Sequence, residues 1–224
     1  MRPLIGWVAA GLAFLLATAP ARAVVVVSNL TDPGAGVFNV TGLNNSNEAL
    51  ANLFTTGSGM WEINSVTVRF SDNNLNAPPD DFSLSIRLDN AGAPGAVVGT
   101  FDTSVGDVID SADYTYLATA PFSLSGNTSY FLTALPTDPD ASYSAAVALG
   151  TGESSGFGWT IADDNTQSQD GGSSWFDNTG SAMIFSLDAT LTAVPEPGSL
   201  ALLALVGAGL GVRRRKSGRM KSAG

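Results

Sequence analysis

Apolar and polar residues alternate along several short stretches of this chain. The period of two is the one expected of β-strands that bury one side and expose the other. The stretch FSLSIRL at 82–88 places an apolar residue at every second position, and the stretches at 66–70 and 183–191 do the same. These patterns predict strands, and further strands are expected at Val24–Val27, Val97–Phe101, Tyr114–Ala118, Ser129–Leu135, Tyr143–Leu149 and Phe157–Ile161.

Segments rich in Gly, Pro, Asn and Asp separate the predicted strands. Examples are SDNNLNAPPDD, DNAGAPG, PTDPD, ADDN and QDGGSS. These residue types favour turns, because Gly, Asn and Asp tolerate positive φ and Pro fixes φ. No stretch between these segments shows a helical period. We therefore predict an all-β fold: a single jelly-roll-like β-sandwich at 24–193, built from roughly eight to eleven short strands.

The first 23 residues have the pattern of a signal peptide. Arg2 supplies a positive start, and residues 4–19 are apolar and uncharged. Ala21 and Ala23 are the small residues expected at the −3 and −1 positions of a cleavage site. We predict export through the general secretion machinery with cleavage after Ala23. An uncleaved membrane anchor is the alternative.

The C-terminal segment combines a short apolar run with a basic cluster. Residues 200–212 carry no charge and would span roughly 20 Å as a helix, against a hydrocarbon core of roughly 30 Å. We expect a short transmembrane sorting helix that inserts only transiently. The basic cluster Arg213, Arg214, Arg215 and Lys216 holds its own end in the cytoplasm. Residues 217–224 are then a cytoplasmic tail, and residues 24–193 lie on the far side of the membrane.

Residues 194–216 resemble the PEP-CTERM sorting signal. The carrying residues are Val194, Pro195, Glu196 and Pro197, followed by the apolar run and RRRK in that order. The resemblance implies processing by an exosortase, a membrane cysteine protease that cuts near Pro-Glu-Pro. It also implies an inner-membrane-tethered precursor in a Gram-negative bacterium. The mature form would lie at the cell surface or in the extracellular, exopolysaccharide-containing matrix of a biofilm.

The preceding domain resembles the choice-of-anchor extracellular domains, R type. The carrying stretches are WEINSV at 61–66, SLSIRL at 83–88 followed by AGAPGAVV, APFSLSGNTSYFL at 120–132, GFGWTIADD at 156–164 and GGSSW at 171–175. The resemblance implies a β-sandwich at the cell surface or in the matrix, and no defined activity.

Charge is distributed unevenly along the chain. Residues 24–194 hold 19 of the 20 acidic residues but only two basic ones, Arg69 and Arg87, which gives a formal charge of −17. A domain this acidic repels phosphate backbones, so we predict no nucleic-acid partner. Exopolysaccharide is a candidate partner.

Residue types needed for common catalysis are missing from the sequence. The whole chain has no His and no Cys, and residues 24–194 have no Lys. This excludes cysteine nucleophiles, His- or Lys-assisted serine catalysis and zinc sites built from His or Cys. We therefore predict a protein without catalytic activity. The less favoured alternative is a carboxylate-dependent glycoside hydrolase using acids such as Glu62, Asp102, Glu153 and Asp164.

Calcium is the candidate cofactor, because it prefers several oxygen ligands on a bent loop. Three acidic segments could supply them, and the alternative is that their Asp residues serve turns and solubility. The candidate ligands are Asp107, Asp110, Asp113, Asp138, Asp140, Asp163 and Asp164.

A carbohydrate- or ice-binding module is the second functional alternative. It would use flat aromatic or Thr-bearing strand faces. Large aromatic side chains more often fill a core, and we expect this of Trp61 and Trp159. Trp175, between Gly/Ser loops, is expected to be the most exposed tryptophan of the domain.

Overall fold

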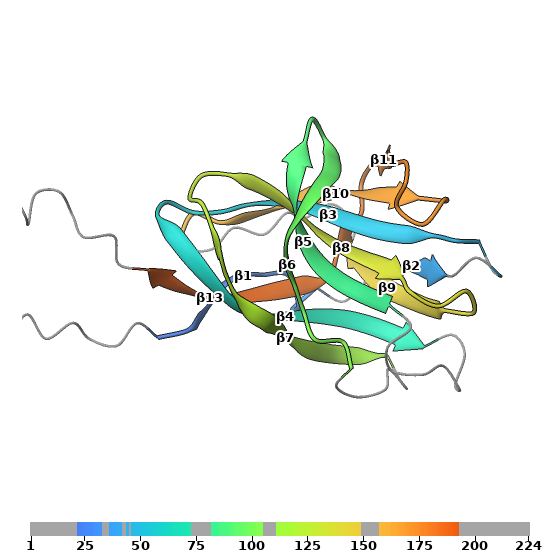
Figure 1. The fold of residues 1–224 in the computed structure, drawn as a ribbon, viewed down its shortest axis with the longest axis horizontal. Helices are drawn as coiled ribbons and strands as arrows, with labels where there is room; N and C mark the ends of the chain where they lie inside the picture. Colours follow the sequence, from blue (N-terminus) through green and yellow to red (C-terminus); the bar gives the residue numbers. More distant parts are fainter. Residues whose placement is uncertain are drawn as a thin grey trace, which may run out of the picture.

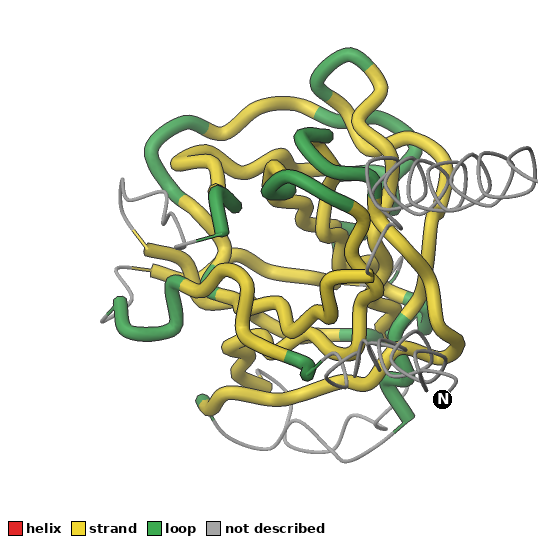
Figure 2. The backbone as a smooth tube through the Cα atoms, turned by 90° about the vertical axis from the view of Figure 1, so that its left-hand side faces the viewer, coloured by secondary structure: helices red, strands yellow, loops and turns green. Residues whose placement is uncertain are grey.

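The computed structural model describes residues 22–32, 36–41, 44, 46–72, 82–104, 111–148 and 157–192. Within these ranges the chain forms thirteen β-strands and no helix (Figures 1 and 2). The strands form two antiparallel sheets, so the predicted all-β sandwich is confirmed. The predicted signal peptide up to Ala21 and the predicted sorting helix lie outside the described residues.

The first sheet has seven strands. Its path is β1–β13–β4–β9–β12, with β7 paired to β4 and β2 paired to β9. The bounds are β1 (Val24–Ser28), β2 (Gly36–Thr41), β4 (Met60–Asp72), β7 (Ala112–Leu124), β9 (Ser142–Ala148), β12 (Ala182–Met183) and β13 (Phe185–Thr192).

The second sheet has six strands in the order β11–β10–β3–β8–β5–β6. The bounds are β3 (Ala49–Thr55), β5 (Phe82–Asn90), β6 (Ala93–Thr100), β8 (Ser129–Pro136), β10 (Thr160–Ser168) and β11 (Phe176–Asn178). Most connections, such as β2 to β3 and β3 to β4, cross from one sheet to the other, as in a jelly roll.

Side chains from both sheets fill the core with two groups of aromatic rings. Phe54 stacks on Trp159 at 5.9 Å between ring centroids, and Trp61 meets Trp159 edge-on at 5.6 Å. At the other end Phe82 contacts Tyr143 at 4.8 Å and Phe70 at 5.0 Å. Trp61 and Trp159 are buried as expected, and Trp175 is half-buried.

Two buried asparagines hold the segment before β13 between the sheets. Asn29 donates from Nδ2 to the carbonyl of Met183 at 2.9 Å and accepts from the amide of Phe185 at 2.7 Å. Asn52, on β3 of the opposite sheet, accepts from the amide of Met183 at 2.7 Å. Both side chains are fully buried, and these bonds satisfy polar groups that would otherwise be orphaned in the core.

Several strand predictions need correction. The expected turn ADDN lies inside β10, where the pairing with β3 shifts register between Ile161 and Asn165. This bulge accommodates the two exposed aspartates without ending the strand. β10 begins at Thr160 rather than at Phe157. Leu191, expected to face the core, is 48% exposed at the end of β13, which stops one residue later at Thr192.

Candidate functional site

Both ends of the described domain lie at the same end of the sandwich. β1 starts at Val24, which pairs with Ala189, and β13 ends at Thr192, which pairs with Met60. Because β1 and β13 are antiparallel neighbours, the start of β1 and the end of β13 lie at the same end of the first sheet (Figure 1). Ala23, at the predicted signal cleavage site, is exposed immediately before β1.

Three loops at this end of the sandwich carry no charge, while Asp89 lies beside the β5–β6 turn at the same end and the exposed Arg22 precedes β1. Residues 55–60, 125–129 and 157–160 converge here, since Thr55 pairs with both Ser129 and Thr160. None of the three segments contains an acidic or basic residue. We call this the terminal end; Met60, Phe157 and Leu191 stand exposed on or beside it.

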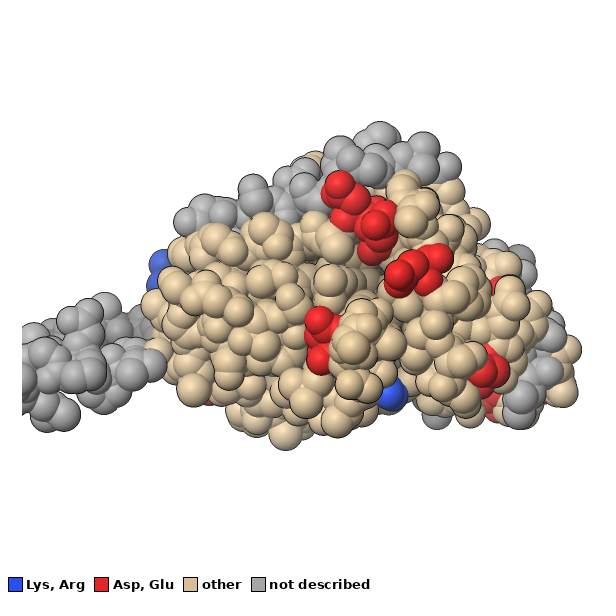
Figure 3. Space-filling view, turned by 90° about the horizontal axis from the view of Figure 1, so that it is seen from above, with Lys and Arg blue, Asp and Glu red and all other residues tan. Residues whose placement is uncertain are grey.

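Carboxylates gather at the opposite end. The residues that lead into β3 include Glu48, the β8–β9 loop includes Asp138 and Asp140, and the loop after β10 includes Asp170. We call these three segments the acidic end. Figure 3 shows that acidic side chains also lie over the middle of this face of the molecule. Glu48, Asp138, Asp140 and Asp170 therefore lie at the end of the sandwich opposite the start of β1 and the end of β13.

The candidate calcium ligands are distributed among different interactions. Asp113 on β7 pairs with Arg69 on β4 through Nε and Nη2, at 2.7 and 3.1 Å. The guanidinium also donates to the carbonyls of Leu30 and Asp32, so it joins the chain after β1 to two strands. The Asp113 hydrogen bond is the main cause that raises the pKa of Arg69.

The remaining candidate ligands serve turns and a strand bulge. Asp138 accepts from the amide of Asp140 at 2.7 Å, and Asp140 accepts from Asn44 at 2.6 Å. Asp164 accepts from the amide of Gly180 at 2.6 Å, and Asp163 is its exposed neighbour in the β10 bulge. Asp107 and Asp110 lie outside the described residues. In the described part of the chain, no three acidic side chains come together as metal ligands.

The best-organised carboxylate is one that the sequence did not single out. Asp170 accepts hydrogen bonds from the Ser174 hydroxyl at 2.6 Å, the Ser174 amide at 2.8 Å and the Ser168 hydroxyl at 2.8 Å. The bond from the Ser174 hydroxyl is the largest cause that lowers the pKa of Asp170 to about 2. A carboxylate held this way stabilises a turn and is a poor proton donor.

The described candidate hydrolase acids lie on separate elements of the fold. Glu62 lies on β4, Asp102 follows β6 and Asp164 lies on β10, while Glu153 is outside the described residues. The Ser104 hydroxyl lowers the pKa of Asp102. A glycosidase acid needs the opposite shift.

The segment that follows β13 was compared with known families. Residues 193–216 match the PEP-CTERM protein-sorting motif. The match contains Val194, Pro195, Glu196, Pro197 and the basic cluster Arg213–Lys216, all outside the described residues. No curated protein matches the chain.

The PEP-CTERM motif indicates an exported protein that an exosortase processes, with a membrane-anchored precursor in a Gram-negative bacterium. It begins at the residue that follows Thr192, the last residue of β13. The described residues contain no helix with the length and apolarity needed to cross a bilayer. The motif therefore joins the sandwich directly, with no separate linker in the sequence.

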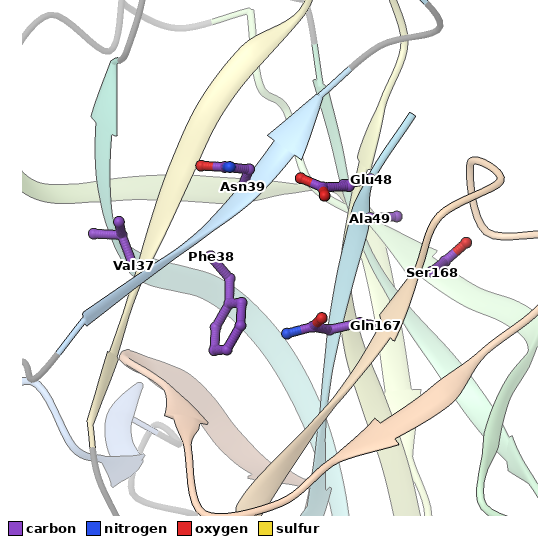
Figure 4. Close-up of a pocket in the computed structure, with 7 residues that line it drawn as sticks. All are labelled: Val37, Phe38, Asn39, Glu48, Ala49, Gln167 and Ser168. Atoms are coloured by element: carbon purple, nitrogen blue, oxygen red, sulfur yellow. The ribbon is translucent and has the colours of Figure 1, made fainter. Parts of the chain in front are cut away.

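A cavity that sequence reasoning missed lies between the two sheets. It measures about 190 Å³ and is lined by residues of β2, the start of β3 and the end of β10: Val37, Phe38, Asn39, Glu48, Ala49, Gln167 and Ser168 (Figure 4). No sequence pattern could have joined these residues, because three separate strands bring them together only in the folded sandwich.

Proposed function

We propose that this chain is a non-catalytic protein of the cell surface or exopolysaccharide matrix. In this proposal the general secretion machinery exports it and an exosortase releases it from its membrane-bound precursor. The observation that carries the proposal is the PEP-CTERM motif that starts directly after β13. The resemblance of the domain to choice-of-anchor extracellular domains, R type, supports an extracellular role.

The geometry of the sandwich suits a precursor held at a membrane. Both predicted membrane segments would leave from the terminal end, where the loops 55–60, 125–129 and 157–160 carry no charge. The acidic end would then point away from the bilayer, where repulsion from anionic lipid headgroups is weakest. Pro195 and Pro197 disfavour helix at the residues before them and keep the segment extended for a protease.

The chemistry of the domain supports a role other than catalysis. The sequence offers no His or Cys for nucleophile activation. Of the carboxylates, Asp102 and Asp170 have a lowered pKa, which suits hydrogen-bonded turns rather than proton donation. These features favour binding or structural work in the matrix.

Intact-mass analysis of the protein recovered from its own cells tests the proposal. We expect a chain that starts at Val24 and ends near Pro195–Pro197, with or without an added group. Glu196→Ala should accumulate as the uncut precursor, whereas the neighbouring Ser199→Ala serves as the matched control and should be cut. Surface material that still carries Arg213–Lys216 would contradict the proposal.

A further inference from the structure

The cavity between β2, β3 and β10 is open at the side of the sandwich. β2 is an edge strand that pairs only with β9 among the described strands, so no described strand of the first sheet covers its other edge. The volume of about 190 Å³ is below the roughly 300–1,000 Å³ of pockets for drug-sized ligands. The space therefore suits one ring-sized unit rather than a long chain.

Gln167 brings an unpaired hydrogen-bond donor to this cavity. Its Nε2 atom is buried and has no hydrogen-bond partner in the structure. Figure 4 shows its amide directed from β10 toward Phe38 across the cavity. A buried donor without a partner costs about 1–3 kcal/mol. A ligand hydroxyl at this position would accept the bond and remove the penalty.

Glu48 brings an acceptor to the same space. Its backbone is fixed, since its carbonyl accepts from the amide of Thr41 at 2.9 Å and its amide donates to Oγ1 of Thr41 at 3.2 Å. Its half-buried carboxylate points from β3 toward β2 in Figure 4. No hydrogen bond to this carboxylate is formed by the described residues, so it is available to a ligand donor.

Phe38 supplies an apolar surface across the cavity from these two polar groups. The ring packs against the core with part of its surface and remains half-buried at the cavity. An aromatic face beside an amide donor and a carboxylate acceptor matches a pyranose ring, which has one face of C–H groups and a rim of hydroxyls. Aromatic walls with a few placed polar groups are the usual form of small-molecule sites.

The charge of the domain narrows the ligand class. Glu48 lies in the cavity wall, and residues 24–194 carry a formal charge of −17. Uronic acids and sugar phosphates would be repelled. We propose that this cavity binds a single pyranose unit without negative charge, as part of a polysaccharide. This binding proposal rests on the proposed function in one respect: a protein of the exopolysaccharide matrix would meet such a polysaccharide there.

Saturation-transfer NMR on the protein as recovered from its cells tests the site. The probes are glucose, mannose, galactose and N-acetylglucosamine at millimolar concentration, with glucuronic acid as the anionic comparison. We expect saturation transfer to at least one neutral sugar and at least severalfold weaker binding of glucuronic acid. Transfer to none of the neutral sugars, which would leave water as the partner of Gln167, overturns the proposal.

Variants separate binding at the cavity from binding elsewhere. Gln167→Leu should weaken binding at least tenfold without lowering the unfolding temperature, because it removes an unpaired buried donor. Phe38→Leu should weaken binding as well. Gln169→Leu, an exposed position two residues away, is the control and should bind normally. Unchanged binding by Gln167→Leu overturns the proposal. The C-terminal mass reports independently on sorting, so the two proposals can fail separately.

Discussion

At the scale of single residues, buried polar side chains hold this sandwich in register. Asn29 and Asn52 reach the backbone around Met183 from opposite sheets. No sequence pattern marked either of them, since an Asn in a strand region usually indicates a turn. The burial of Trp61 and Trp159 could be predicted, because large aromatic side chains generally enter the core.

Asp170 provides a test of pH dependence at this scale. The lowered pKa means that the loop contacts are fully present above the ordinary Asp value of 3.8 and are lost as pH falls through about 2. In an NMR titration we expect the Ser173 and Ser174 amides to report a midpoint near 2.

Two serine variants make the titration specific. Ser174→Ala should raise the midpoint toward the ordinary Asp value, since the Ser174 hydroxyl is the largest cause of the shift. Ser173→Ala is the matched control, because the Ser173 hydroxyl donates to the backbone carbonyl of Asp170 rather than to its carboxylate. Equal midpoints in both variants would contradict this assignment.

At the scale of elements, alternation identified the strands whose two sides differ in burial. β5 matches its predicted range closely, since its apolar positions recur along one face, and β8 also matches although residues 130–134 are all buried. β3 was not predicted; Ala49, Leu50, Ala51 and Asn52 are all buried, so its burial does not alternate either. β2 was missed because GVFNVT shows no clear alternation. Without β2, the cavity that this strand lines could not be predicted either.

The loops of the terminal end depend on a close backbone crossing. A Cβ at Gly126 would overlap the backbone O and N atoms of Gly59, and these atoms cannot move aside as the end of a flexible side chain could. We expect Gly126→Ala to lower the free energy of unfolding by about 3 kcal/mol, as overpacking does.

Gly92→Ala is the control for this crossing. Gly92 has a φ of +90°, but a methyl group at this position would meet nothing within 4 Å, so only backbone strain of about 1–2 kcal/mol is expected. Urea denaturation of both variants measures the difference. An equal or smaller loss in Gly126→Ala would show that the two loops do not cross as described.

At the scale of the whole molecule, the charge of −17 on residues 24–194 sets the response to salt. Screening of carboxylate repulsion should raise the unfolding temperature as NaCl is added. The effect should be centred on the acidic end, where Glu48, Asp138, Asp140 and Asp170 are placed.

Calcium at matched ionic strength separates screening from a specific site. A further rise in unfolding temperature, reversed by a chelator, would show that the protein binds calcium, for which Asp107 and Asp110 are the candidate ligands. Asp107→Asn with Asp110→Asn should then remove the rise, and Asp138→Asn should not. Equal midpoints in NaCl and CaCl₂ would exclude calcium as a ligand of this protein.

The position of β13 also sets the timing of folding during export. This strand lies between β1 and β4, yet it is the last strand before the sorting motif. The first sheet cannot close around its missing inner strand until almost the whole chain has emerged. We therefore expect the polypeptide to stay unfolded, and so competent for translocation, while it crosses the membrane. We expect the domain to complete its fold only when the apolar residues 200–212 reach the membrane. The exosortase would then act on a folded domain.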